Sequence, residues 1–126
     1  MTTMLRDVVQ RGTGRRALAL GRSDLGGKTG TTNEAADTWF NGFSPDIAAS
    51  AWVGFPGHAP LGAREYGSST PLPIWIDFMR VALADRPEVP LQQPPGLVTL
   101  RIDTVTGAPA PAGARDAPFE YFLEEH

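Results

Sequence analysis

The sequence predicts an α+β fold in which a three-stranded antiparallel sheet is packed by helices. Three strand patterns follow one another, at residues 26–32, 38–43 and 47–55, and only short polar turns separate them. Strands joined by short turns pair as antiparallel neighbours, so these segments are expected to form a meander. Apolar residues recur at helical spacing on either side of the meander, at residues 2–11 and 72–84, and predict the helices.

The predicted N-terminal helix, residues 2–11, carries one apolar stripe: Met4, Leu5, Val8 and Val9. Thr2 or Thr3 is expected to cap its start, and Gly12 is expected to end it in the left-handed conformation. Residues 12–25 are rich in glycine and arginine, and we expect them to form a solvated connection that leads into the first strand.

The second and third strands have different patterns. In the second, Trp39 and Phe43 share one face, while Phe40 and Gly42 share the other. The third, residues 47–55, is largely apolar on both faces, so it is expected to lie in the centre of the sheet and to be covered on both sides. The tryptophans are expected to be core or sheet-packing aromatics rather than a ligand-binding box.

The second predicted helix, residues 72–84, has a wide apolar face: Leu72, Trp75, Ile76, Met79, Ala82 and Leu83. So much apolar surface predicts that the helix packs against the sheet. Thr70 is its expected cap, and Asp77 and Arg80 are expected to pair on its outer side at i, i+3 spacing.

The composition changes after this helix, because seven of the twelve prolines lie in residues 87–126. We therefore expect two parts, a folded segment over residues 1–86 and a proline-rich, weakly packed appendage over residues 87–126. Within the appendage, residues 97–103 form one predicted strand, and residues 119–123 are a short apolar segment expected to dock. Residues 124–126 are expected to be disordered.

Composition and charge exclude several classes of function. A net charge of −3 argues against nucleic acid as the main partner, and the absence of cysteine excludes disulfides and thiolate chemistry. With only His58 and His126 as imidazole ligands, no metal or other cofactor is expected. No apolar run approaches the roughly 18 residues of a membrane span, and the first residues lack a signal-peptide pattern. The chain by itself is therefore expected to be soluble and untargeted.

The most informative stretch reads Gly-Gly-Lys-Thr-Gly-Thr-Thr-Asn, from Gly26 to Asn33, and its Lys28 is the only lysine of the chain. A phosphate-binding P-loop would need a glycine five residues before Gly27, where Arg22 stands, and a helix after the lysine. Neither requirement is met. The remaining interpretations are an exposed lysine in a Gly/Thr loop, and the Lys-Thr-Gly strand motif of penicillin-binding proteins and serine β-lactamases.

The segments around this motif resemble the C-terminal part of the transpeptidase domain of class A penicillin-binding proteins, the bifunctional peptidoglycan synthases. The segments that carry the resemblance are residues 28–33, 37–45 and 51–55, with 1–5, 11–14 and 72–75. The resemblance is close over residues 1–86 and looser over residues 95–123. It implies a partial penicillin-binding, serine β-lactamase-like transpeptidase domain.

The resemblance also implies a role for each residue of the motif. Lys28 and Thr31 are the implied catalytic residues: Lys28 places positive charge near the substrate carboxylate and the proton-transfer network, and the backbone N–H of Thr31 is one of two oxyanion donors. The hydroxyls of Thr29 and Thr31 are implied to bind that carboxylate, and Gly30 to leave room for an extended substrate backbone. The implied ligands are the D-Ala-D-Ala stem peptide of peptidoglycan and β-lactams.

The nucleophile of that family is absent from the chain. Its motif is Ser-x-x-Lys, and none of the serines has a lysine three residues on; the Ser-x-Asn motif is absent too. The chain is therefore expected to be inactive alone and to need an upstream transpeptidase segment, in an enzyme anchored at the outer face of the cytoplasmic membrane. Without that segment, apolar faces around Val53, Phe55 and Trp75 are expected to be exposed, so that the isolated chain self-associates.

Two alternatives from other classes stay open. The first is a self-standing, non-catalytic binding or interaction module. The second is a fragment of a β-lactamase or D,D-carboxypeptidase, which shares the Lys-Thr-Gly motif but fits less well with residues 39–43 and 52–55. Of the other polar residues, Glu34 and Asp37 are expected to be turn residues, and His58 an exposed loop residue.

Overall fold

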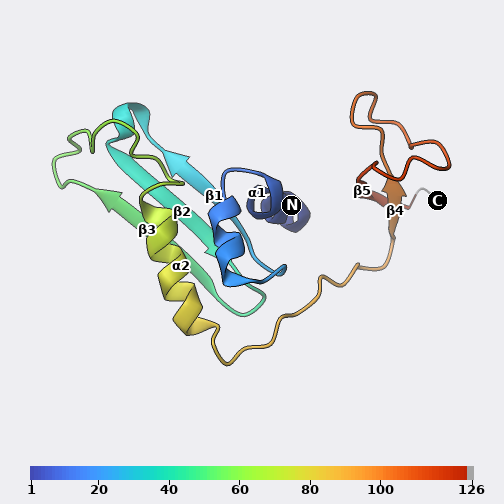
Figure 1. The fold of residues 1–126 in the computed structure, drawn as a ribbon, viewed down its shortest axis with the longest axis horizontal. Helices are drawn as coiled ribbons and strands as arrows, with labels where there is room; N and C mark the ends of the chain where they lie inside the picture. The colour runs from blue at the N-terminus through green and yellow to red at the C-terminus, as the bar shows by residue number, and fades with distance from the viewer. Residues whose placement is uncertain (125–126) are drawn as a thin grey trace. The chain divides into compact units, whose positions relative to one another are not determined.

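The fold was analysed in a computed structural model that describes residues 1–124; residues 125–126, part of the end expected to be disordered, lie outside the described residues. The elements in chain order are α1 (Thr2–Arg11), η1 (Arg15–Leu20), β1 (Gly26–Thr31), η2 (Asn33–Ala35), β2 (Asp37–Phe43), β3 (Ala48–Gly54), α2 (Pro71–Ala82), β4 (Leu97–Arg101) and β5 (Phe119–Leu123) (Figure 1). They form two compact units, Met1–Pro90 and Leu91–His126, and each unit is described by itself.

The first unit contains the predicted three-stranded antiparallel meander, with strand order β1-β2-β3. The predicted α+β class is confirmed. The expectation that the third strand is central is wrong, since β2 lies between the other two and β3 is an edge strand. Helix α2 packs on the sheet face that carries Phe40, and Trp52 on β3 stays 45% exposed on the other face.

The core lies between the sheet and α2. Trp75 of α2 meets Phe40 of β2 edge to face, with ring centroids 5.0 Å apart, and its Nε1 donates to the carbonyl of Ala49 over 3.1 Å. Gly42 is required here, because a Cβ would lie 2.6 Å from the Trp75 ring. The predicted packing of this helix on the sheet is therefore confirmed. Trp75 is only 1% exposed, so the expectation that the face around it is open in the isolated chain is wrong, because α2 turns this ring onto the sheet.

The start of the chain forms the predicted helix α1, but its ends differ from expectation. Neither threonine caps it with a side-chain hydrogen bond, since Met1 occupies the N-cap position. Gly12 has φ −111° and ψ −152°, which is extended rather than left-handed. Glycine is needed there because a Cβ would lie only 2.9 Å from the Cα of Val8, so close packing rather than backbone conformation selects it.

The connection after α1 is more ordered than the sequence indicates. It contains the short helix η1, and it buries Ala17 and Leu25 in the core. The carboxylate of Asp24 is buried as well, where the Arg22 guanidinium donates two hydrogen bonds to it at 2.9 and 2.6 Å. The prediction of a solvated connection was wrong because these side chains turn inward and satisfy one another.

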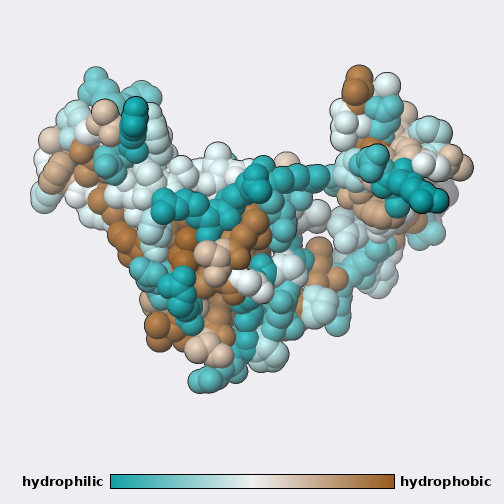
Figure 2. All heavy atoms as spheres, in the orientation of Figure 1, coloured by the Kyte–Doolittle hydropathy of each residue, from teal (hydrophilic) through white to brown (hydrophobic). Residues whose placement is uncertain are grey.

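Helix α2 begins at Pro71, and Thr70 stands at its N-cap without a capping side-chain bond, since its hydroxyl donates to Glu65 instead. The predicted Asp77–Arg80 pair forms, with 2.8 Å between Oδ1 and Nη1. A second apolar side of this helix is open to solvent at three positions: Ile74, Phe78 and Val81. Figure 2 shows hydrophobic atoms gathered over the position of α2.

The first unit extends to Pro90, because the Ser23 hydroxyl donates to Glu88 and the N–H of Val89 donates to Asp24. In the second unit β4 and β5 pair as an antiparallel hairpin. The apolar segment that was expected to dock is thus the second strand, β5. The Arg101 guanidinium lies over the Phe119 ring, 4.5 Å from its centroid.

Candidate functional site

The predicted motif lies on β1, an edge strand of the first sheet. In an antiparallel pair, backbone groups alternately face the partner strand and face away from it. The N–H of Thr32 donates to the carbonyl of Asp37 over 3.0 Å, so the residues two and four before Thr32 also face β2. The N–H and C=O groups of Thr29 and Thr31 therefore point to the free edge of the sheet.

Lys28 lies at this free edge and is exposed. Its Nζ donates to the Thr29 carbonyl over 2.9 Å and to Thr29 Oγ1 over 3.2 Å. The first of these contacts agrees with an outward-facing Thr29 carbonyl. The structure therefore brings one ammonium group and one hydroxyl together beside backbone groups that face the free edge of the sheet.

Thr31, at the end of β1, is held by the loop that precedes α2. The N–H of Gly67 donates to Thr31 Oγ1 over 3.1 Å. A Cβ on Gly67 would lie 2.5 Å from the Trp39 carbonyl oxygen and 2.8 Å from the Gly30 carbonyl oxygen, so only glycine fits against this pair of strands. Sequence reasoning did not predict this residue, because its partner lies 36 positions away.

Gly30 is the other predicted site glycine, and its surroundings differ from those of Gly67. A Cβ there would meet only the Trp39 side chain, at 3.4 Å, which is about van der Waals contact. Internal packing among residues 1–124 therefore does not explain the absence of a side chain. The open space beside Gly30 is suited to a ligand that approaches the strand closely.

Thr13 is a second residue that contacts the motif and that the sequence did not predict as part of the site. Its Oγ1 lies 2.9 Å from Thr29 Oγ1, a hydrogen-bond distance. The sequence signal was the Gly-Thr-Gly run after α1, which carries part of the resemblance but predicts no contact with the motif. In the structure, this run brings a third hydroxyl to the motif.

Asp37 begins β2 and joins the loop after β3 to the sheet. Its carboxylate accepts a hydrogen bond from Trp52 Nε1 over 2.9 Å and lies 3.0 Å from His58 Nδ1. The hydrogen bond from Trp52, and then the contact with His58, lower the pKa of Asp37 below its ordinary value. His58 is an exposed loop residue, as expected. This cluster fastens the loop after β3 to the sheet, and these two contacts do not involve the motif on β1.

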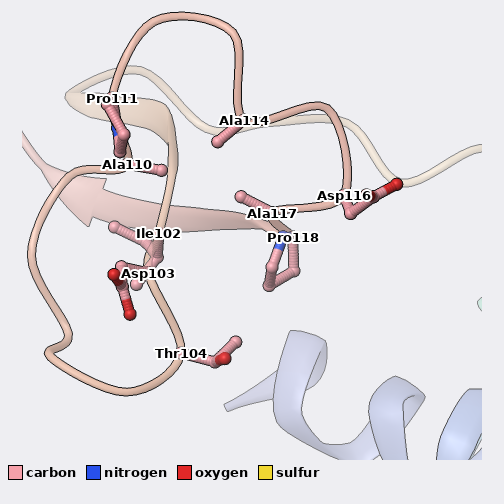
Figure 3. A pocket seen from close by; sticks show the side chains of 9 residues that line it. All are labelled: Ile102, Asp103, Thr104, Ala110, Pro111, Ala114, Asp116, Ala117 and Pro118. Atoms are coloured by element: carbon pink, nitrogen blue, oxygen red, sulfur yellow. The ribbon is translucent and has the colours of Figure 1, made fainter.

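Surface hollows in the described part of the chain include one near the motif and one in the second unit. One, of about 320 Å³, borders Lys28, Asn41 and Ser50 on the sheet face that carries the lysine. The other, of about 330 Å³, is in the second unit, where Asp103 and Asp116 point away from each other (Figure 3). Asp103 accepts hydrogen bonds from the N–H groups of Val105 and Thr106, so it serves a turn.

Two other kinds of functional feature, a metal-binding cluster and a membrane-spanning helix, are absent from the residues that the structure describes. Within residues 1–124, no three His, Asp or Glu side chains gather in a way that would hold a metal ion. No helix in that range combines the length and the apolar character needed to cross a membrane. The motif on β1 is the candidate site because it gathers an ammonium group and hydroxyls beside the outward-facing backbone of an edge strand.

The α+β fold, in which a helix packs across a three-stranded antiparallel sheet, is that of part of a penicillin-binding protein. The chain belongs to the family of penicillin-binding protein 1A.

The relatives agree in both sequence and structure. The chain is 56% identical to penicillin-binding protein 1A of Pseudomonas aeruginosa over 99% of its length, and 42% identical to that of Rickettsia conorii over 90%. It spans only 15% and 14% of those relatives. The crystal structure of penicillin-binding protein 1A from Haemophilus influenzae matches 97% of the chain and 19% of its own, with a TM-score of 0.88 and 37% identity. No protein-family model matches the chain.

Proposed function

We propose that β1 is one wall of the active site of a D,D-transpeptidase that cross-links peptidoglycan stem peptides. In this proposal Lys28 supplies positive charge beside the terminal carboxylate of the D-Ala-D-Ala substrate. The hydroxyls of Thr29 and Thr31 bind that carboxylate, and the N–H of Thr31 stabilises the oxyanion formed when the carbonyl is attacked. β-Lactams are ligands of the same wall.

The observation that carries the proposal is the orientation of the edge strand. The backbone groups of Thr29 and Thr31 face away from β2, and Lys28 Nζ lies beside them. An extended peptide can add to such an edge as a further strand, held by main-chain hydrogen bonds. Gly30 leaves the space that a closely approaching peptide needs. The terminal carboxylate of such a peptide would then lie next to Lys28 and to the hydroxyls of Thr29 and Thr31.

The acylation step needs a serine that this chain does not supply. A lysine would have to follow the serine by three residues, and Lys28, the only lysine, follows Leu25 at that spacing. We therefore propose that residues 1–126 alone form no acyl-enzyme. The serine would come from another segment of a longer protein such as the relatives, which in this proposal acts at the outer face of the cytoplasmic membrane.

The test is acylation by a fluorescent penicillin. Two proteins are compared: the isolated chain, and a chimaera in which the chain replaces the matched segment of the Pseudomonas aeruginosa relative. We expect labelling of the chimaera only. Lys28→Gln in the chimaera should slow labelling at least tenfold, because hydrogen bonds and charge at a transition state are each worth more than about 1.4 kcal/mol.

The control variant is Arg80→Gln, which removes an exposed positive charge from α2 at a distance from the motif. It should label at the rate of the unchanged chimaera. Labelling of the isolated chain would show that one of its own serines is a nucleophile, and equal labelling of the Lys28→Gln chimaera would remove the motif from the site. Either result would contradict the proposal.

A further inference from the structure

The turn that follows α1 is built to present one side chain to β1. The N–H groups of Gly12 and Gly14 both donate to the Val8 carbonyl, at 3.1 and 2.9 Å, so the turn is fastened to the end of the helix. A Cβ on Gly12 would lie 2.9 Å from Val8 Cα, and one on Gly14 would lie 3.2 Å from the Val8 carbonyl oxygen. The two glycines thus allow close packing, and Thr13 between them is exposed.

Thr13 meets the motif through its hydroxyl, whose oxygen is 2.9 Å from Thr29 Oγ1. A threonine hydroxyl has one proton to donate and two lone pairs that can accept. Lys28 Nζ, which can only donate, uses one of the lone pairs of Thr29 Oγ1 at 3.2 Å. The second lone pair is in reach of the Thr13 hydroxyl.

A carboxylate bound at Thr29 fixes the direction of this contact. An ionised carboxylate only accepts, so Thr29 must give it the single hydroxyl proton. Thr13 then donates to Thr29, and the two hydrogen bonds point the same way and strengthen each other. Without Thr13, the Thr29 hydroxyl is free to rotate its proton toward other acceptors.

We propose that Thr13 is a positioning residue of the candidate site, which orients the Thr29 hydroxyl toward the carboxylate of the substrate or β-lactam. This inference rests on the function proposed above for β1. In this inference the Gly-Thr-Gly turn, which is separate from β1, holds the Thr29 hydroxyl that binds the carboxylate.

The test uses the chimaera and the second-order rate constant for acylation by a fluorescent penicillin. Thr13→Val keeps the shape and removes the hydroxyl, and should slow acylation about three- to tenfold, the value of one neutral hydrogen bond. Thr13→Ser keeps a hydroxyl and should stay within about twofold of the unchanged chimaera. Thr2→Val, at the exposed start of α1, is the matched control and should have no effect.

A double-mutant cycle separates positioning from a structural role. If Thr13 acts through Thr29, then Thr13→Val should change the rate less than about twofold once Thr29→Val is present, since the hydroxyl that it orients is gone. A structural role would slow both backgrounds equally and lower the melting temperature. Equal slowing in both backgrounds, or no effect of Thr13→Val, would overturn the inference.

The same experiment distinguishes this inference from the proposed function. If Lys28→Gln slows acylation and Thr13→Val does not, the function of β1 stands and the role of Thr13 fails. If the chimaera is not acylated, or if Lys28→Gln acylates at the unchanged rate, the proposed function fails and the role of Thr13 fails with it.

Discussion

The N–H of Gly67 donates to Thr31 Oγ1 over 3.1 Å, and in doing so joins the loop before α2 to the end of the candidate strand. The same glycine lies against the Gly30–Trp39 pair so closely that a Cβ would be 2.5 Å from the Trp39 carbonyl oxygen. Thr31 is thus positioned by two strands and a loop. The loop is part of the support of the site.

Gly67→Ala in the chimaera should therefore displace the loop and remove the donor to Thr31 Oγ1. We expect slower acylation by fluorescent penicillin and a loss of about 1–3 kcal/mol in the free energy of unfolding, as for other overpacked positions. Gly57→Ala is the matched control in the same loop region, since a Cβ there has no atom within 4 Å. Equal acylation rates and equal stabilities of the two variants would show that the close packing of Gly67 does not support the site.

Because the backbone of Thr31 faces the free edge, the roles of its N–H and of its hydroxyl can be tested by different substitutions. Thr31→Ala keeps the N–H, while Thr31→Pro removes it without removing a hydrogen bond to β2, because this residue faces the free edge. We expect Thr31→Pro to slow acylation about 10²-fold or more, the cost of one oxyanion donor, and Thr31→Ala much less. Equal rates for the two variants would mean that the N–H is no oxyanion donor.

The contact of Trp75 with Phe40 and Ala49 predicts a graded loss of stability. Trp75→Phe keeps a ring but loses the hydrogen bond to the Ala49 carbonyl, and should cost about 1 kcal/mol plus any packing loss. Trp75→Ala should cost about 3–5 kcal/mol, because it leaves a cavity against Phe40. The measure is the temperature at which the heated chimaera loses half of its penicillin labelling. Indistinguishable midpoints would contradict this account of the core.

The buried carboxylate of Asp24 predicts acid sensitivity of the first unit. Burial by itself would raise the pKa of Asp24, but the hydrogen bonds from Arg22 and from the Val89 N–H outweigh it and lower the pKa below its ordinary value. A lowered folded pKa contributes stability that is present above the unfolded pKa and is lost as the pH falls through the folded pKa. The loss should therefore begin near pH 4, the ordinary Asp value, and continue below it.

Asp24→Asn should remove this part of the pH dependence. At neutral pH it should destabilise the chimaera by about 3 kcal/mol or more, because Arg22 loses its buried partner. Melting temperatures of both proteins between pH 7 and about pH 3 give the comparison. Parallel curves would show that Asp24 does not set the acid sensitivity.

The isolated chain is expected to self-associate. Ile74, Phe78 and Val81 form an exposed apolar side of α2, and Trp39 and Trp52 pack on each other on the sheet face opposite α2. Exposed apolar groups of this extent favour association. Light scattering after gel filtration should show mass that rises with concentration, and Phe78→Glu with Val81→Glu should reduce it. A monomer with a sharp, concentration-independent melt would contradict the prediction.

Local patterns in the sequence were sufficient to predict the two α-helices and the three strands of the first unit, but not its short helices η1 and η2. The helical spacing of Leu72, Trp75 and Met79 predicts α2, and the alternation around Phe40 predicts β2. The resemblance carried by residues 28–33 led to the family that the relatives confirm. The roles of Lys28, Thr29, Gly30 and Thr31 stay predictions, since acylation has to test them.

The sequence by itself determined the two α-helices and the strands of the first sheet, because the periodicity of apolar side chains is a local property. Tertiary structure decided the position of β3 at the edge, the inward turn of Asp24 and Arg22, and the contacts of Thr13 and Gly67 with β1. The contacts of Thr13 and Gly67 join residues far apart in the chain, and the Asp24–Arg22 pair, although local, is completed by the distant N–H of Val89. Such contacts form because buried polar groups need hydrogen-bond partners once the core has packed. No local pattern in the sequence specifies those distant partners.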